Sequence, residues 1–334
     1  MPIDNEIICK GAIIVKSTLI FGGVDGTGEW NDIGYGKTFE NSHVNSLFKG
    51  WTEGPKEYYR GPTTADNKID RLTRLQAQRI FNLVTQCWRN QGKKAVFLAG
   101  YSRGGAAVIE VAMWLKARNI PVECLILFDP VDRTPQVGLP WRNTPIVDTV
   151  RHVIYAQRDP SSLSRESFSN CGTQIEDRSK TKLSYYMSPK TTHGGMGGAP
   201  WPDPSIGFIN EGFPDGMTRV TVADDEAGSR RVRDWAFDLI FEAIYSCKQR
   251  LAGEEETTPI PDFQVTPQVG GNLPPTGGRP GQRIHVVVAG DWLSKIALKY
   301  YGNAMKFDII HKANLQIIGP NPDIIKPGQR LVIP

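Results

Sequence analysis

The chain has few cysteines, and none of them stands in a pattern that carries chemistry of its own. The five are Cys9, Cys87, Cys124, Cys171 and Cys247. Their odd number and wide spacing argue against a disulfide framework, and no Cys-x-x-Cys pair or zinc-ligand spacing is present. We therefore expect free thiols in a reducing compartment.

The sequence also lacks a long apolar run, a basic stripe and an export signal. No stretch of about 18 apolar residues is present, which argues against a transmembrane segment. The net charge of +4 is spread along 334 residues, so no nucleic-acid partner is expected. Residues 1–10 lack the basic start, apolar run and cleavage site of a secretory signal. We expect synthesis in the cytoplasm without a signal peptide, and delivery to the cell envelope, the periplasm or a target cell by a specialised secretion system.

Composition divides the chain into three parts. Residues 1–252 have the apolar content of a globular domain. Residues 253–282 are rich in Pro, Gly and Thr and too poor in apolar residues to order themselves, which predicts a flexible linker. Residues 283–334 return to a globular pattern and predict a second, small domain.

Strand-like and helix-like segments alternate through the first domain. Apolar strands are expected over residues 11–21, 93–99, 122–129 and 150–159, and helices over residues 68–90, 106–119 and 229–251. This alternation predicts an α/β fold in which helices cover both faces of a mostly parallel sheet. Residues 200–216 are expected to be loop-like.

A G-x-S-x-G motif, Gly100 to Gly104, separates an expected strand from an expected helix. A sharp turn in this position exposes the serine oxygen, so Ser102 is predicted to be a nucleophile. The backbone N–H of Arg103 then lies at a helix N-terminus, where it can stabilise an oxyanion. The alternative is an ordinary glycine-rich turn between a strand and a helix.

A serine nucleophile needs a histidine that takes its proton, and in this fold class the histidine follows it in the chain. His193 stands in the glycine-rich segment HGGMGG, which predicts a flexible loop. His152 lies inside an expected strand, and His285 and His311 belong to the C-terminal part. We therefore predict that His193 is the general base.

Two aspartates end expected strands after the motif. Asp129 ends the first of these strands and Asp159 ends the second. Strand order favours Asp159 as the acid that orients the histidine, with Asp129 as the alternative. Asp132 and Asp148 are weaker candidates.

Several motifs occur in the order typical of the DUF2235-type hydrolases, which the segment from Ile13 to Ala199 resembles. They are VDGTGEWND, PKEYYRGP, GYSRGGA, FDPV and HGGMGG. That family includes phospholipase effectors of the type VI secretion system. The resemblance implies an α/β-hydrolase fold, Ser102 as nucleophile and His193 as base. It also implies a second oxyanion donor in the Gly22 to Gly28 loop, for which the candidates are Gly23 and Gly26.

The C-terminal part resembles a LysM domain over residues 284–334. The landmarks are Gly290-Asp291, Tyr301-Gly302, Asn314 and Pro327-Gly328-Gln329, within a strand, helix, helix, strand pattern. LysM domains typically bind N-acetylglucosamine polymers such as peptidoglycan, and related domains serve as adaptors in injection machines. The resemblance places the binding groove at Asp291, Trp292, Leu293, Asn321, Pro322, Asp323, Ile324 and Ile325.

Together these features predict a serine hydrolase that cleaves carboxylic esters, in particular a lipase or phospholipase effector or toxin, without metal or cofactor. The expected partners are a lipid or acyl-ester substrate, peptidoglycan or a secretion-machine component, and an immunity protein. Two alternatives remain open. One is a non-catalytic cell-wall-binding or tail-hub adaptor, and the other is an esterase that acts on small acyl or cell-wall esters.

Overall fold

The chain divides into two compact units, residues 1–255 and 256–334, and each is described by itself. The predicted linker, residues 253–282, lies outside the described residues except for Gly253. The computed structural model describes residues 18–29, 31–63, 72–89, 94–131, 144–188, 190–199, 207–253, 283–287, 291, 293–301, 307–319, 325–326 and 328–334.

Six parallel strands form the sheet of the N-terminal domain, in the order β2-β1-β3-β4-β5-β6. Their bounds are β1 Thr18–Val24, β2 Lys56–Tyr59, β3 Lys94–Tyr101, β4 Val122–Phe128, β5 Val150–Arg158 and β6 Lys182–Ser188. Strands β1, β3 and β4 are almost wholly buried, as expected for a parallel sheet with both faces covered. The predicted α/β architecture is confirmed.

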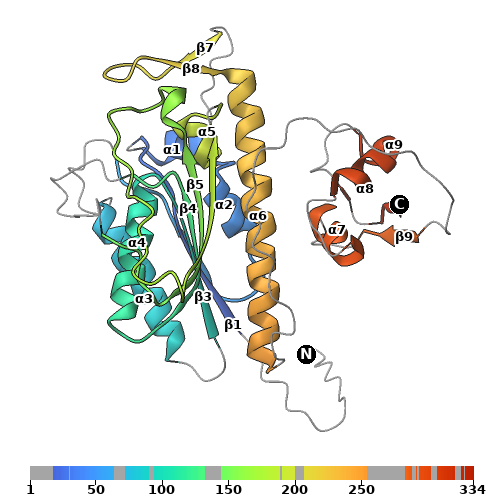
Figure 1. Cartoon of the computed structure of the whole chain (residues 1–334), viewed down its shortest axis with the longest axis horizontal. Coiled ribbons are helices and arrows are strands. Elements are labelled where there is room, and N and C mark those ends of the chain that lie inside the picture. Colours follow the sequence, from blue (N-terminus) through green and yellow to red (C-terminus); the bar gives the residue numbers. More distant parts are fainter. Residues whose placement is uncertain are drawn as a thin grey trace. The chain divides into compact units, whose positions relative to one another are not determined.

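Helices cover both faces of this sheet (Figure 1). One face packs against α3 (Thr73–Trp88) and α4 (Arg103–Lys116), and residues such as Ile20 and Val96 point toward them. The other packs against α2 (His43–Gly50) and α6 (Val222–Ala252), with α1 (Asp32–Phe39) and α5 (His193–Gly197) beside them. Although α6 is long, no helix among the described residues combines the length and apolarity needed to cross a membrane.

The turn between β3 and α4 is packed directly against the end of β1. A methyl group on Gly104 would lie 2.1 Å from the Val24 carbonyl oxygen, and one on Gly100 would lie 2.4 Å from the Gly104 carbonyl oxygen. Both obstacles are backbone atoms that cannot move aside, so both positions require glycine. This close approach brings the loop after β1 next to the G-x-S-x-G turn.

Two parts of the domain differ from the sequence expectation. The tract around Tyr58, where the sequence analysis expects no strand, contains β2, which is only four residues long and pairs with β1. The expected loop around residue 210 contains a hairpin, β7 (Phe208–Asn210) and β8 (Met217–Thr221). Such short strands owe their existence to tertiary pairing rather than to a pattern of their own.

The C-terminal domain has strands β9 (Arg283–Val286) and β10 (Arg330–Ile333), which pair antiparallel. Between them in the chain lie α7 (Leu293–Tyr301), α8 (Phe307–Ala313) and α9 (Leu315–Ile318). Asn314, one of the sequence landmarks, is buried and bonds α8 to β10: its side chain donates to the Ile310 and Val332 carbonyls and accepts from the Val332 N–H. Its role in this structure is therefore to join the elements of a small core.

Candidate active site

Ser102 lies at the sharp turn between β3 and α4. Its φ of 54° belongs to a region that residues other than glycine rarely adopt. The turn is held in this conformation because the Ser102 N–H donates to the Phe128 carbonyl at 3.1 Å and the strand and helix on either side are buried. The strained strand-to-helix turn that the motif predicts is therefore present at the carboxyl end of β3.

His193 begins α5, where the sequence predicts a flexible loop. The helix forms because Thr192 caps it, and Asp225 of α6 holds Thr192 in place. The backbone N–H and the hydroxyl of Thr192 donate to the Asp225 carboxylate at 2.6 and 2.9 Å. The Nε2 atom of His193 lies 2.9 Å from Ser102 Oγ, so the imidazole and the hydroxyl are within hydrogen-bond distance.

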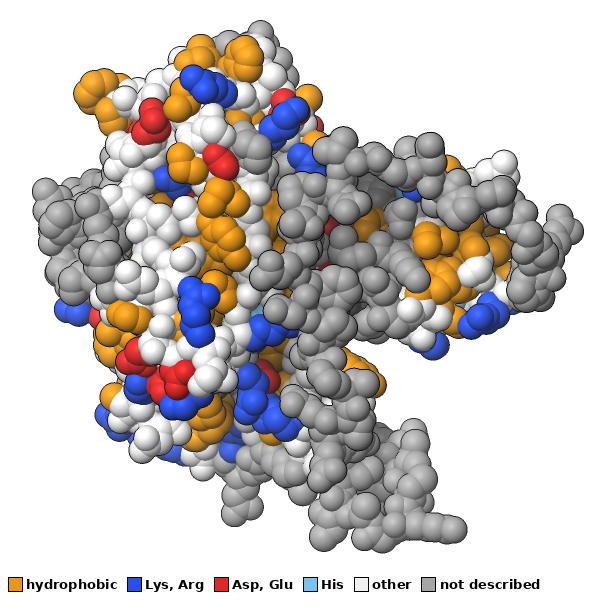
Figure 2. Space-filling model, viewed as in Figure 1, with side chains coloured by type: hydrophobic (Ala, Val, Ile, Leu, Met, Phe, Trp, Pro, Cys, Tyr) orange, Lys and Arg blue, Asp and Glu red, His pale blue; other side chains and the backbone are white. Residues whose placement is uncertain are grey.

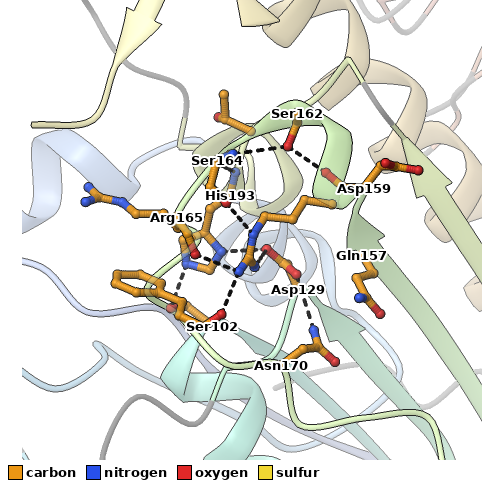
Figure 3. A network of polar contacts seen from close by, with 12 residues as sticks. Ser102, Asp129, Gln157, Asp159, Ser162, Ser164, Arg165, Asn170 and His193 are labelled. Atoms are coloured by element: carbon orange, nitrogen blue, oxygen red, sulfur yellow. Dashed lines mark hydrogen bonds and ion pairs between the residues drawn. The ribbon is translucent and has the colours of Figure 1, made fainter. Parts of the chain in front are cut away.

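The carboxylate next to His193 belongs to Asp129, which follows β4 and is fully buried. Its Oδ2 atom lies 2.6 Å from His193 Nδ1. The prediction that Asp159 contacts this histidine is wrong. Asp159 Oδ1 accepts from the Ser161 N–H at 2.8 Å and so caps the short 3-10 helix η3 (Pro160–Ser162). Figure 3 shows its carboxylate pointing away from His193.

The reason for this difference is local. An aspartate followed by proline has the residue pattern of a helix N-terminus, and Asp159 is used there as a cap. Asp129 also precedes proline, but its φ of 42° places it in a tight turn directly after the strand that neighbours β3. The acid thus comes from the strand adjacent to the nucleophile strand rather than from the next one.

The weaker sequence candidates lie elsewhere. Asp148 forms ion pairs with Lys116 and Lys180 at 2.7 and 2.8 Å. His152 lies in β5 and contacts Ser184 Oγ at 2.9 Å, and burial lowers its pKa to about 3. Asp132 is outside the described residues.

Arg158, at the end of β5, is a site residue that the sequence analysis did not find. Its Nη1 atom lies 2.5 Å from the same Asp129 oxygen that contacts His193. Its remaining N–H groups donate to the carbonyls of Ser164, Arg165 and Phe168 at 2.8 to 3.0 Å. The sequence signal for Arg158 was a charged residue at the end of an apolar strand. The sequence analysis assigned a role to the next residue, Asp159, instead.

The charges around the triad favour a neutral histidine and an ionised aspartate. Burial alone would raise the pKa of Asp129, but Arg158 and His193 outweigh it, so the pKa lies below its ordinary value. Burial lowers the pKa of His193; the Asp129 hydrogen bond opposes this, and the charges of Arg158 and Arg165 add to the lowering. His193 is therefore in the form that can accept a proton.

The predicted oxyanion donors fall into two groups. Arg103 is the first residue of α4, and a methyl group on Gly26 would come within 3.0 Å of Ser102 Cβ, so both adjoin the nucleophile. Gly23 lies inside β1, in register with strand residues on both sides. The prediction that Gly23 is an oxyanion donor in the loop is wrong, because β1 extends through Gly22 and Gly23 to Val24 before the loop begins.

Arg103 also contacts the loop after β1 through its side chain. Its Nε donates to Thr27 Oγ1 at 2.6 Å, and its Nη2 donates to the Thr63 carbonyl at 2.9 Å. The residue after the nucleophile therefore holds the loop after β1 by a side-chain contact that the motif alone does not reveal.

Among the described residues, no group of three or more His, Cys, Asp or Glu is placed to bind a metal ion.

A buried carboxyl group, Asp25, lies at the start of this loop. Ser42 Oγ and Tyr58 Oη donate to its Oδ2 atom at 2.5 and 2.7 Å, whereas its Oδ1 atom has no hydrogen-bond partner. Burial raises the pKa of Asp25 to about 7, although these hydrogen bonds and the Gly26 N–H lower it. A carboxyl group that holds its proton until the pH approaches neutrality is consistent with a buried Oδ1 atom that accepts no hydrogen bond.

In the C-terminal domain the structure describes three of the eight predicted groove residues. Asp291 lies 2.8 Å from His285 Nε2 in a buried pair. Leu293 is a core residue, 3% exposed, so the prediction that it lines a groove is wrong for its side chain. Ile325 packs partly buried against the same core. The other five, Trp292, Asn321, Pro322, Asp323 and Ile324, lie outside the described residues.

Residues 285–334 match the family described as "LysM domain". The C-terminal domain is a LysM domain. The order of elements, with two paired strands enclosing the helices, agrees with this assignment. The predicted LysM domain is therefore confirmed, and its core includes Ile296, Ile310 and Leu331.

An uncharacterized protein of Deinococcus radiodurans is 47% identical over 55 residues, which cover 16% of this chain and 20% of that protein. The chain thus spans about a fifth of the length of this relative.

Three solved structures illustrate the structural similarity. One is the Tle1 effector bound to the VgrG spike from the Type 6 secretion system, at 15% identity, with 60% of this chain and 55% of that chain covered and a TM-score of 0.36. The second is Est1E from Butyrivibrio proteoclasticus, at 13% identity, with 69% of this chain and 90% of that chain covered and a TM-score of 0.38. The third is the NocB thioesterase domain from the nocardicin cluster, at 14% identity, with 55% of this chain and 87% of that chain covered and a TM-score of 0.31.

The fold follows from the chain's own geometry: a parallel sheet covered on both faces and a strained serine between strand and helix, with the aspartate and histidine later in the chain. The N-terminal domain has an α/β-hydrolase fold.

Asp25 gives a testable dependence of stability on pH. Its folded pKa, about 7, is raised above the value of roughly 3.9 for an unfolded aspartate, so folded protein binds a proton that unfolded protein has released. The stability from this proton is complete below about pH 4 and is lost as pH rises through 7. Between these limits, we expect the free energy of unfolding to fall by on the order of 4 kcal/mol more for the wild type than for Asp25→Asn.

Urea unfolding across this pH range measures the difference. Other buried groups, such as His43, contribute equally to both proteins and cancel in the comparison. The matched control is Asp224→Asn, which removes a partly exposed carboxylate, 40% accessible, in the first turn of α6. If wild type and Asp25→Asn show the same pH dependence, Asp25 is ionised in the folded state.

Proposed function

We propose that the chain is a serine ester hydrolase in which Ser102, His193 and Asp129 form the catalytic triad. The observation that carries the proposal is the unbroken series of contacts from Ser102 Oγ to His193 Nε2, 2.9 Å, and from His193 Nδ1 to Asp129 Oδ2, 2.6 Å. These three groups meet at a strained turn followed by a helix N-terminus. Nucleophile, base and orienting acid are the parts that acyl transfer requires.

In the proposed reaction, His193 takes the proton of Ser102 as its oxygen attacks the ester carbonyl. The backbone N–H of Arg103, with a donor from the loop that contains Gly26, receives the negative charge that develops on the carbonyl oxygen. His193 then gives the proton to the leaving alcohol, and an acyl-enzyme forms on Ser102. Water, activated by the same histidine, releases the acid and restores the serine. Every step uses groups that lie around Ser102.

Asp129 has two partners in this scheme. It fixes the tautomer of His193 and stabilises the imidazolium that forms during attack. Arg158 keeps the carboxylate ionised but also opposes a second positive charge beside it. We therefore infer a base whose pKa stays low, so that it remains unprotonated in mildly acidic surroundings.

We propose a lipid acyl ester, in particular a phospholipid, as the substrate, and an effector or toxin role after delivery by an injection-type secretion system. Support comes from the order of the motifs VDGTGEWND, GYSRGGA and HGGMGG, which resembles that of the DUF2235-type hydrolases. In this proposal the LysM domain binds peptidoglycan and retains the enzyme at the cell envelope. An immunity protein would protect the producing cell.

The first prediction from the proposed function concerns the nucleophile. Ser102→Ala removes the attacking oxygen while leaving a small side chain at the turn, so turnover of a soluble aryl ester should fall by about 10⁴-fold or more with the unfolding midpoint nearly unchanged. A fluorophosphonate probe should label the wild type at Ser102 and leave the variant unlabelled. Labelling of another residue, or near-normal turnover by the variant, would rule out this mechanism. A wild type that neither reacts with the probe nor cleaves the ester would favour the non-catalytic adaptor alternative.

The second prediction separates the two aspartates. Asp129→Asn presents His193 with the wrong hydrogen-bond partner and should reduce kcat on the same ester by about 10⁴-fold. Asp159→Asn should keep turnover within about threefold of the wild type, because asparagine caps a helix as well as aspartate does. A larger loss for Asp159→Asn than for Asp129→Asn would contradict the contacts around His193.

The third prediction concerns the LysM domain. A chain ending at Gly253, the cap of α6, should retain wild-type turnover of a soluble ester, since the triad and both halves of its core lie before this residue. The full chain should sediment with purified peptidoglycan and the shortened chain should stay in the supernatant. If neither sediments, docking to a component of the secretion machine becomes the better account of the LysM domain.

A further inference from the structure

The β7–β8 hairpin carries large apolar side chains that face the solvent. Phe213, in the turn, is fully exposed at 101%, and Phe208 and Met217 are 49% and 50% exposed. Figure 2 shows hydrophobic side chains together with basic and acidic ones at the top of the N-terminal domain, where Figure 1 places this hairpin. Large apolar side chains gathered at one exposed tip are typical of a surface that contacts another apolar phase.

The charges of the hairpin are sorted between its two sides. Glu211 and Asp215 turn inward, and their side chains are 0% and 1% exposed. Arg219, in contrast, lies on the exposed face of β8. Across residues 207–221, the outward surface therefore combines apolar groups with a cation and presents no acidic side chain.

The two inward acids attach the hairpin to the triad. The Ser164 hydroxyl donates to Glu211 Oε1 at 2.7 Å, and the same Ser164 oxygen accepts the His193 N–H at 2.8 Å. Asp215 accepts from the Ser167 N–H and from Arg165, at 2.8 and 3.3 Å. Buried polar contacts through Ser164 therefore join the hairpin to His193.

We propose that the β7–β8 hairpin docks on an anionic phospholipid surface, inserting Phe208, Phe213 and Met217 among the acyl chains while Arg219 meets the phosphates. The inference rests on the proposed function, because it places the triad at the surface that holds its ester substrate. Apolar side chains on a projecting turn suit a deformable apolar phase, whereas protein partners bind through broad patches of matched shape. Because Arg219 is exposed and no acidic side chain of the hairpin faces outward, the hairpin should bind an anionic surface in preference to a neutral one.

The test measures binding of the full chain, carrying Ser102→Ala to prevent hydrolysis, to vesicles of phosphatidylcholine with phosphatidylglycerol. Phe213→Ser should weaken binding by about tenfold, since one buried aromatic side chain is lost from the lipid. Arg219→Gln should weaken binding to these vesicles by about fivefold and leave binding to phosphatidylcholine alone unchanged. The matched control is Tyr245→Ser, which removes a 60% exposed aromatic side chain of α6 and should bind as the parent does.

Activity separates this proposal from the hydrolase proposal. With Ser102 intact, Phe213→Ser should keep wild-type turnover of a soluble ester and lose turnover of vesicle lipid about tenfold. If soluble turnover depends on Ser102 but Phe213→Ser binds vesicles like the wild type, the docking surface is wrong and the hydrolase stands. If vesicle binding depends on Phe213 but no ester is cleaved, the docking surface stands and the proposed function is wrong.

Discussion

The arrangement of the site depends on one buried carboxylate, Asp129, whose Oδ2 atom contacts both His193 and Arg158. A carboxylate without exposure is stable in the ionised form only when cations or donors surround it. Here the partners also organise their surroundings. Arg158 holds the carbonyls of residues 164, 165 and 168, and the Ser164 hydroxyl in turn accepts the His193 N–H. The charge of Asp129 thus holds His193 in two ways. It contacts the imidazole ring directly, and it holds the backbone N–H through Arg158 and Ser164.

This arrangement divides the negative charge of Asp129 between catalysis and structure. Arg158 orders the loop that packs Phe168 against the His193 ring, with ring centroids 5.2 Å apart. The same guanidinium reduces the support that Asp129 gives to a protonated histidine. Under the proposed function, such a site is ordered before substrate arrives, at the expense of some basicity in its general base.

The sequence predicted those parts of the fold and site that depend on local chemistry. The alternation of segments predicted the sheet, and the G-x-S-x-G pattern between strand and helix predicted the strained turn at Ser102. Landmarks such as Asn314 identified the LysM domain, and the side chain of Asn314 joins α8 to β10 in its small core. Elimination among the histidines led to His193, which the structure brings next to Ser102.

What escaped prediction depends on contacts between distant segments. Strand order favoured Asp159, but a local cap uses that carboxylate, and the strand beside β3 supplies Asp129 instead. Arg158 has meaning only once β5 and β4 are neighbours. The strands of the hairpin are likewise too short to show a strand pattern in the sequence. The role of its inward acids, Glu211 and Asp215, can be assigned only from their contacts with Ser164 and Arg165.

The long helix α6 has a consequence for how this kind of enzyme can diversify. Near its N-terminus, Asp225 holds the cap of α5, whereas the other end of α6, at Ala252, lies about 40 Å away at 1.5 Å per residue. The domain that follows in the chain is therefore joined at the end of α6 that is remote from Asp225. Recombination at this junction can exchange that domain without a compensating change around the serine.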